Sequence, residues 1–310
     1  MPGNLVQIRD TAGPRLAGPR LPGWLRKSET HFESVQLLKR DLRRLHLNTV
    51  CESARCPNIH ECFHRGTATF LILGNLCTRG CGFCSVPKGS PSRQEFRLDP
   101  EEPAHVARMA LRMNLRYVVI TSVNRDDLFD GGSRHFAATV REVRRALPGA
   151  RIEVLTPDFC GNLDAVHTVV DAESDVFNHN LETVEALYRR VRPKADYRQS
   201  LEVLNEAKRC RPGILTKSGL MVGLGEIPPQ VEEALRDLRA SGVDVITIGQ
   251  YLQPARRNLP VAGYVTPAQF EAYRRYGMAL GFLTVFSGPF VRSSYMADRV
   301  NEAARRGGAA

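Results

Sequence analysis

Apolar positions along the chain follow two spacings, and their alternation predicts the architecture. Short runs rich in Val, Ile, Leu and Phe have the length of buried strands and recur from residue 67 onward. These runs predict strands at 67–74, 117–123, 151–157, 175–180, 215–225, 244–252 and 282–288. Apolar residues at helical spacing predict helices between them, at 135–147, 181–191, 200–210, 229–241 and 267–280.

Strands that are apolar on both faces and separated by helices are typical of a parallel sheet. No Gly-x-Gly-x-x-Gly motif opens the first helix, which disfavours a doubly wound nucleotide-binding sheet. Six β/α units and a last strand therefore predict an α/β fold of the partial (β/α)6 TIM-like barrel type. We place the barrel at residues 67–282, an N-terminal extension at 1–66 and a C-terminal extension at 283–310.

The composition is that of a globular protein with a basic surplus. The 310 residues are 43% hydrophobic, enough for a full core, and no apolar run reaches the roughly 18 residues of a membrane span. The first residues lack a signal-peptide pattern, so we expect a soluble cytoplasmic monomer without a membrane partner. A formal charge of +10 favours an acidic partner or only a basic solvated surface, and no basic run interleaved with aromatics indicates nucleic-acid binding.

Cysteines are concentrated in one part of the chain. Six of the eight lie between residues 51 and 84, which indicates a metal site rather than disulfides in a chain without a secretion signal. Cys77, Cys81 and Cys84 form a C-x3-C-x2-C loop directly after the first predicted strand. Three thiolates can bind three irons of an iron-sulfur cube and leave the fourth iron open for a cofactor. Arg79 is expected to add positive charge beside these thiolates.

A second trio, Cys51, Cys56 and Cys62, lies upstream, and zinc competes with iron-sulfur for both trios. His60 and His64 could complete a zinc site with the upstream trio, so counting ligands leaves zinc open. Neither trio has the paired C-x2-C pattern of closed zinc sites, and the position after a barrel strand favours iron-sulfur. A basic zinc protein that binds nucleic acid remains the alternative from another class.

The motif "CTRGCGFC" at 77–84 resembles the signature of the radical S-adenosylmethionine (SAM) enzymes, in which SAM binds the open iron. The upstream "CESARCPNIHEC" at 51–62 is similar to the extra cysteine motif of the lipoyl synthases, one family of that superfamily. The likeness continues in order through 66–74, 121–132, 177–184, 218–226, 248–254 and 288–295. Another radical SAM enzyme, of the biotin synthase-like group, is the alternative within the superfamily.

The resemblance implies two [4Fe-4S] clusters with different roles. One, held by the 77–84 motif, would cleave SAM to a 5'-deoxyadenosyl radical, which abstracts hydrogen from an unactivated carbon. The other is an auxiliary cluster, bound by the upstream cysteines and by Ser294 of the Arg-Ser-Ser-Tyr motif at 292–295. The implied reaction inserts two sulfur atoms, drawn from the auxiliary cluster, at C6 and C8 of a protein-bound octanoyl-lysine.

The resemblance also implies partners. The octanoyl chain would be carried by lipoyl carrier domains, in the E2 subunits of 2-oxoacid dehydrogenases or in the glycine cleavage H protein. The electron would come from a donor such as ferredoxin or flavodoxin.

Polar residues after the second and fourth predicted strands are candidates for holding SAM, and one arginine could pair with its carboxylate. These candidates are Thr121, Ser122, Asn180, Glu182 and Arg198. Glu182 could instead favour a helix N-terminus, and Arg198 could form only a surface ion pair. Cys160 and Cys210 are expected to be incidental thiols.

Overall fold

The computed structural model describes residues 22–25, 39–53, 56, 58, 61, 68–89 and 97–294. In this part of the chain a single sheet has eight strands in sequence order. The strands are β1 (Asn48–Thr49), β2 (Thr69–Ile72), β3 (Tyr117–Ser122), β4 (Arg151–Leu155), β5 (Val176–Asn178), β6 (Leu215–Val222), β7 (Val245–Gln250) and β8 (Thr284–Gly288). β1 pairs antiparallel with β2, and every pairing from β2 to β8 is parallel.

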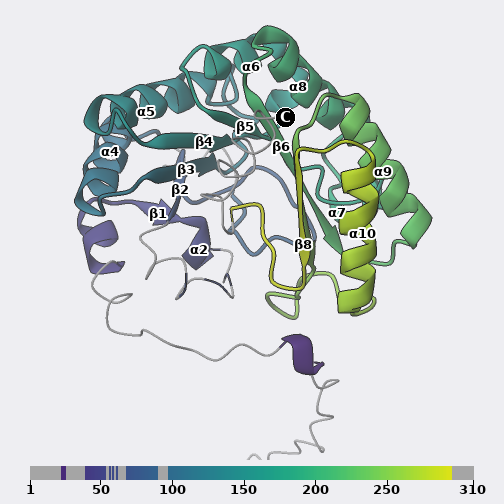
Figure 1. Ribbon diagram of the computed structural model, residues 1–310. Coiled ribbons are helices and arrows are strands. Elements are labelled where there is room, and N and C mark those ends of the chain that lie inside the picture. The colour runs from purple at the N-terminus through teal and green to yellow at the C-terminus, as the bar shows by residue number, and fades with distance from the viewer. Residues whose placement is uncertain are drawn as a thin grey trace, which may run out of the picture.

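Helices cover the outer face of the curved sheet (Figure 1). The outer layer consists of α4 (Glu102–Arg112), α5 (Ser133–Ala146), α6 (Leu163–Val170), α8 (Tyr197–Cys210), α9 (Pro228–Ala240) and α10 (Pro267–Ala279). Shorter elements are η1 (Gly23–Leu25), α2 (Val50–Ser53), η3 (Phe159–Gly161), η4 (Glu185–Leu187) and α7 (Tyr188–Val191). Among the helices that the structure describes, none is long and apolar enough to cross a membrane.

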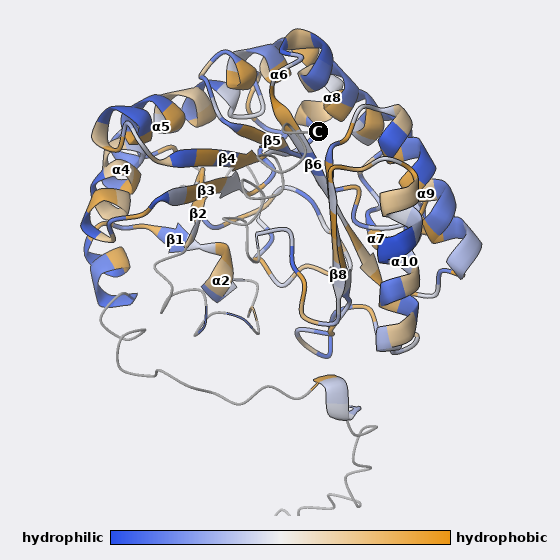
Figure 2. Ribbon diagram, viewed as in Figure 1, coloured by the Kyte–Doolittle hydropathy of each residue, from blue (hydrophilic) through white to orange (hydrophobic). Residues whose placement is uncertain are grey.

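The core lies between the sheet and this helical layer. One cluster packs β2 to β5 against α4, α5 and α6, and a second packs β6 to β8 against α8, α9 and α10. Phe70 and Phe136 in the first cluster and Leu235 and Ile246 in the second are fully buried. The helices carry hydrophilic as well as hydrophobic residues (Figure 2), as expected for helices with one buried face.

The inner face of the sheet contains a buried polar network toward the amino ends of the strands. Because side chains alternate along a strand, Tyr117, Glu153 and Lys217 lie on the face opposite the helices. The Lys217 ammonium lies 3.0 Å from both Glu153 carboxylate oxygens, and both side chains are buried. The Tyr117 hydroxyl and the Asn178 amide also donate to Glu153, at 2.7 and 2.8 Å. This network fills the barrel below the cavity described in the next section.

The predicted fold is confirmed, with four differences in its elements. All seven predicted strands form, and α4, α6 and β1 were not predicted. The helix prediction for 181–191 is wrong over its first residues, because the helical conformation begins only with η4 at Glu185. Glu182 there donates its backbone N–H to the Gly219 carbonyl and accepts from the Met221 N–H. Sheet-like hydrogen bonds to β6 thus replace a helical turn.

We expect Lys217→Met to lower the free energy of unfolding by about 3–5 kcal/mol, because it leaves Glu153 buried without its counter-charge. Denaturant titration measures this loss. The control is Arg274→Met, which breaks the exposed Arg274–Glu271 pair and should leave the stability nearly unchanged. Equal effects of the two substitutions would contradict a structural role for the buried pair.

Candidate functional site

A cavity of about 510 Å³ opens on the inner face of the sheet, at the carboxyl ends of its strands. Its wall includes Leu71 of β2, Thr121 of β3, Leu155 of β4, Met221 of β6 and Gln250 of β7. Active sites of (β/α) barrels lie at this end of the strands. The cavity is therefore the place where the predicted site residues should be sought.

The loop after β2 brings Cys77, Cys81 and Cys84 to the cavity wall. Segments later in the chain hold this loop by hydrogen bonds. The Gly82 N–H donates to the Val191 carbonyl at 2.9 Å, and the Asn258 amide donates to the Cys84 carbonyl, also at 2.9 Å. A Cβ atom at position 82 would lie 2.8 Å from the Leu259 side chain, so the close approach there requires glycine.

The environment of these thiols suits metal binding. Burial, together with negative charge on Cys81 and Cys77, raises the pKa of Cys84 to about 12. Burial also raises the pKa of Cys81, against the opposing positive charge of Arg192. Cys81 and Cys84 therefore remain protonated until a metal replaces their protons. With Cys77 on the same loop, the three thiols fit the corners of an iron-sulfur cube.

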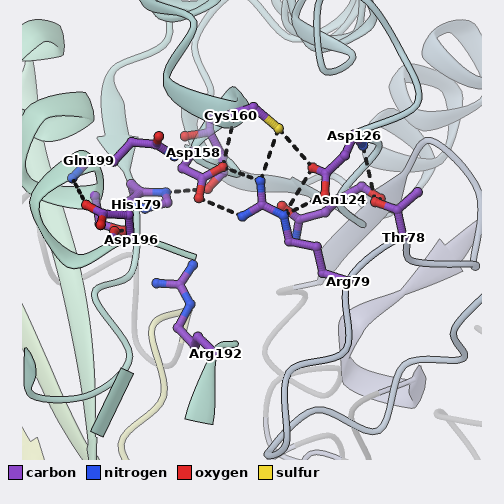
Figure 3. Close-up of polar contacts among 12 residues, drawn as sticks. Thr78, Arg79, Asn124, Asp126, Asp158, Cys160, His179, Arg192, Asp196 and Gln199 are labelled. Carbon is purple, nitrogen blue, oxygen red and sulfur yellow. Dashed lines mark hydrogen bonds and ion pairs between the residues drawn. The ribbon is translucent and has the colours of Figure 1, made fainter. Parts of the chain in front are cut away.

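Arg79 adds positive charge beside the thiols, as the sequence predicts, and this charge lowers the pKa of Cys81, but it is paired rather than free. Its guanidinium is buried and forms ion pairs with Asp158 at 2.6 Å and Asp126 at 2.8 Å (Figure 3). Burial opposes the charged form of Asp158, but hydrogen bonds from Arg79 and its charge lower the pKa of this carboxyl to about 2. Two carboxylates thus outweigh the single guanidinium, and Arg192 is the stronger positive influence on Cys81.

The structure brings four of the five predicted SAM contacts, Thr121, Ser122, Asn180 and Glu182, to the cavity wall. The Thr121 hydroxyl donates to the Leu155 carbonyl at 2.7 Å, and the Asn180 amide donates to Glu182 at 3.1 Å. Within the described residues, the Ser122 hydroxyl and the Asn180 amide oxygen are buried without a hydrogen-bond partner. Buried polar atoms normally find partners, so such atoms facing a cavity fit a polar ligand such as SAM.

The structure does not bring Arg198 to the cavity. It lies on α8 with its side chain exposed and pairs with Glu185 at 3.3 Å. Arg192, which the sequence analysis missed, lines the cavity instead and is buried. Its Nη1 donates to the Asn180 carbonyl at 3.0 Å, and its Nε has no hydrogen-bond partner in the described part of the chain. Arg192 is therefore better placed than Arg198 to meet a carboxylate in the cavity.

His179 also lines the cavity and was not predicted. Its Nδ1 lies 2.9 Å from the Thr156 carbonyl, so this nitrogen carries a proton and donates it. Burial and the positive charge of Arg192 lower the pKa of His179 to about 4. The imidazole is therefore neutral at pH 7, with Nε2 as a free acceptor toward the cavity.

Two residues of the upstream trio lie on the same cavity. Cys51 on α2 and Cys56 line it, and the Cys56 N–H donates to the Cys51 carbonyl at 3.1 Å. Burial, together with negative charge on Cys56, raises the pKa of Cys51 to about 12. Cys62 lies outside the described residues, as do His60 and His64 of the zinc alternative.

The C-terminal segment reaches this cavity from the other end of the chain. Arg292, Ser293 and Ser294 line it, whereas Tyr295 lies outside the described residues. A Cβ atom at position 249 would lie 2.1 Å from the Val291 carbonyl oxygen, so the segment can cross β7 only over glycine.

The Asn58 amide, close to Cys56 in sequence, donates to the Phe290 carbonyl at 2.8 Å. The two extensions therefore meet at the cavity. Within the described ranges, no three Cys, His, Asp or Glu side chains lie close enough together to hold a single metal ion.

A family model for the radical SAM superfamily matches residues 71–238. The chain is thus a member of the radical SAM superfamily, which uses a [4Fe-4S] cluster and SAM. It is 55% identical to the lipoyl synthase of Rubrobacter xylanophilus, over 92% of this chain and 88% of that protein. The lipoyl synthase of Thermus thermophilus is 52% identical, over 93% and 89% of the two chains. The chain belongs to the lipoyl synthase family of radical SAM sulfur-inserting enzymes.

Solved structures with similar folds are distant in sequence. Methylornithine synthase gives a TM-score of 0.52 at 16% identity and covers 91% of this chain and 89% of its own. Streptococcus suis SuiB bound to S-adenosylmethionine gives a TM-score of 0.51 at 13% identity, over 80% of this chain and 58% of that one. At such identities these structures support the fold alone.

We expect the stability of the cluster-free protein to fall by roughly 2 kcal/mol between pH 7 and pH 5 because of His179 alone. Its folded pKa of about 4 lies below the ordinary histidine pKa of 6.5, so the unfolded chain binds the extra proton as the pH falls through this window. Denaturant titrations at both pH values should show this loss reduced in His179→Gln. His46→Gln is the control and should retain it. An unchanged loss in His179→Gln would contradict the buried neutral imidazole.

We expect Arg192→Lys to raise the dissociation constant for SAM about tenfold or more, because lysine keeps the charge but loses the planar fork that holds a carboxylate. Anaerobic calorimetry with the cluster-loaded protein measures this constant. Arg198→Lys is the matched control, and it should bind SAM like the wild type. If Arg198→Lys weakens SAM binding and Arg192→Lys does not, the assignment is wrong.

Proposed function

We propose that the protein inserts two sulfur atoms at C6 and C8 of an octanoyl-lysine on a lipoyl carrier domain, and that an auxiliary [4Fe-4S] cluster donates the sulfur. Residues 67–282 would supply the radical SAM barrel. The extensions at 1–66 and 283–310 would supply the auxiliary site. Cys51, Cys56, Cys62 and Ser294 are the proposed ligands of the auxiliary cluster.

One observation carries this proposal: both groups of thiols face the same cavity. Cys51, Cys56 and Ser294 line it together with Cys77, Cys81 and Cys84. An enzyme that makes a carbon radical and then quenches it with sulfur needs both centres within reach of one substrate carbon. A single cavity lined from both sides meets that requirement.

The residues of the auxiliary site fit a cluster with one weak ligand. Thiolates are soft ligands that iron-sulfur clusters prefer, and a serine oxygen is a harder and poorer one. An iron held by Ser294 would therefore be the labile corner, which suits a cluster that gives up sulfur. Cys62 is assigned by its place in the sequence motif.

The cavity wall also suits an octanoyl chain. Its apolar members include Leu71, Val123, Leu155, Leu220 and Met221. An apolar wall binds a hydrocarbon and excludes water that would react with a radical.

When bound, the first cluster and SAM supply the hydrogen-abstracting radical, and the auxiliary cluster supplies sulfur. The side chains of the protein hold these groups and orient the substrate. Arg192 Nε and the Asn180 amide oxygen have no hydrogen-bond partner among the described residues, and they would hold the polar ends of SAM.

The reaction requires a protein that carries the substrate and a protein that delivers electrons. Octanoylated carrier domains, in the E2 subunits of 2-oxoacid dehydrogenases or in the glycine cleavage H protein, would present the chain. A reduced ferredoxin or flavodoxin would deliver electrons, and the +10 charge favours acidic partners of this kind. We propose that the protein works as a cytoplasmic monomer.

The test is a turnover with anaerobically reconstituted protein, SAM, a reductant and an octanoyl-lysine peptide. Mass spectrometry should detect deoxyadenosine and a peptide that carries two added sulfur atoms. Deoxyadenosine without a thiolated peptide would contradict sulfur insertion and favour a different radical SAM reaction.

Replacing the proposed serine ligand should separate the two steps. Ser294→Ala is expected to reduce sulfur insertion more than deoxyadenosine formation, because only the auxiliary site is disturbed. Ser293→Ala is the matched control, and it should affect neither product as strongly. Equal loss of both products in Ser294→Ala would argue against its role as a ligand.

A further inference from the structure

The Arg79 side chain is held by an unusually complete set of contacts (Figure 3). Nη1 and Nη2 each donate to a different oxygen of Asp158 at 2.6 Å, which is a bidentate fork. Nε donates to Asp126 at 2.8 Å, and Nη2 also lies 3.3 Å from the Cys160 sulfur. The Arg79 side chain is 3% exposed and that of Asp158 is fully buried.

These contacts join three consecutive loops of the barrel. Arg79 lies in the cysteine loop after β2, between Cys77 and Cys81, whereas Asp126 follows β3 and Asp158 follows β4. Arg79 lines the cavity, but neither carboxylate does. The two aspartates therefore reach the cysteine loop through the guanidinium, although the charge of Asp158 also acts on His179 and Arg192.

A second set of bonds reinforces the same connection. The Thr78 hydroxyl donates to the Asn124 carbonyl at 3.0 Å and accepts from the Asp126 N–H at 3.2 Å. The Asn124 amide and the Arg79 N–H both approach the Cys77 sulfur, at 3.9 and 3.4 Å. The loop after β3 thus holds Thr78, the residue that follows the first thiol.

The turn that presents Asp158 is strained. Phe159 and Cys160 have φ angles of 49° and 54°, in the left-handed region that such residues rarely adopt. Phe159 is buried and packs edge-to-face on Phe136, with ring centroids 6.3 Å apart. Strain of this kind persists where the surrounding structure enforces it, often at functional sites. Here it places the Asp158 carboxylate against Arg79.

The charges in this group indicate that it positions the cysteine loop more than it adds positive charge beside the thiols. One guanidinium faces two carboxylates, and its effect on the pKa of Cys81 is weaker than that of Arg192. A bidentate fork fixes direction as well as distance. Groups that orient metal ligands without touching the metal commonly control how firmly the metal is held.

We infer that Arg79, Asp158 and Asp126 form a positioning clamp, which holds the cysteine loop in the geometry that its [4Fe-4S] cluster and SAM require. This inference rests on membership of the radical SAM superfamily and is independent of the proposed auxiliary cluster. Asp126 and Asp158 do not line the cavity. Their effect is transmitted through the backbone of residues 77–81.

The test measures how firmly the first cluster is held. Arg79→Lys, Asp158→Asn and Asp126→Asn are made in a Cys51→Ala/Cys56→Ala background, so that bound iron reports on the 77–84 loop alone. We expect an iron chelator to extract the cluster roughly 10- to 100-fold faster from the clamp variants. The electron paramagnetic resonance spectrum of the reduced cluster should also lose part of its change on SAM addition.

Asp127→Asn is the matched control, because Asp127 pairs with Arg125 in the same loop at 2.7 Å and does not line the cavity. It should release iron like the parent. Asp126 is partly exposed, so Asp126→Asn provides a folded variant if the loss of Asp158 prevents folding. Iron release and a SAM-induced spectrum equal to those of Asp127→Asn would overturn the inference. Faster release in the clamp variants alone would support it.

Discussion

The parallel pairing of β2 to β8 is the constraint on which the rest of the structure depends. Because all seven strands run in the same direction, their carboxyl ends meet at one rim, and each following loop reaches the same cavity. The cysteine loop after β2, Asn180 after β5 and Gln250 of β7 converge there for this reason. Residues from both ends of the chain, such as Cys51 and Ser294, reach the same rim and so line the same cavity.

Buried charges are arranged in layers along the inner face of the barrel. At the lower end Lys217 neutralises Glu153, which lets the barrel fill with a polar pair rather than with apolar side chains. At the rim Arg79 is neutralised by two carboxylates. Arg192 differs, because its Nε lacks a partner among the residues described. Arg192 is therefore a positive charge that a bound carboxylate can meet, whereas Lys217 and Arg79 are neutralised by protein carboxylates.

Sequence periodicity predicted most of the fold, because a strand that is buried on both faces appears in the sequence as a continuous run of apolar residues. It failed at 181–184, where the pattern is helical but Glu182 forms backbone hydrogen bonds to β6 and has a φ angle of 69°. Local pattern cannot reveal such a tertiary contact. It also missed β1, since a strand of two residues has no period.

The sequence predicted the candidate site best where its residues are marked by a short, regular spacing along the chain. The thiol loop was found because its three cysteines lie close together in sequence. Arg192 was missed and Arg198 chosen because both follow the same strand, and only the folded chain shows which one faces the cavity. The partners of Arg79 lie far from it in sequence, so its paired charge could not be predicted.

The central claim is that one cavity serves two separate iron-sulfur clusters. Iron analysis of the anaerobically reconstituted protein tests it most directly. The account predicts about eight iron atoms per chain in the wild type, and about four in both Cys77→Ala/Cys81→Ala and Cys51→Ala/Cys56→Ala. About four in the wild type, with none left in one of the double variants, would contradict it.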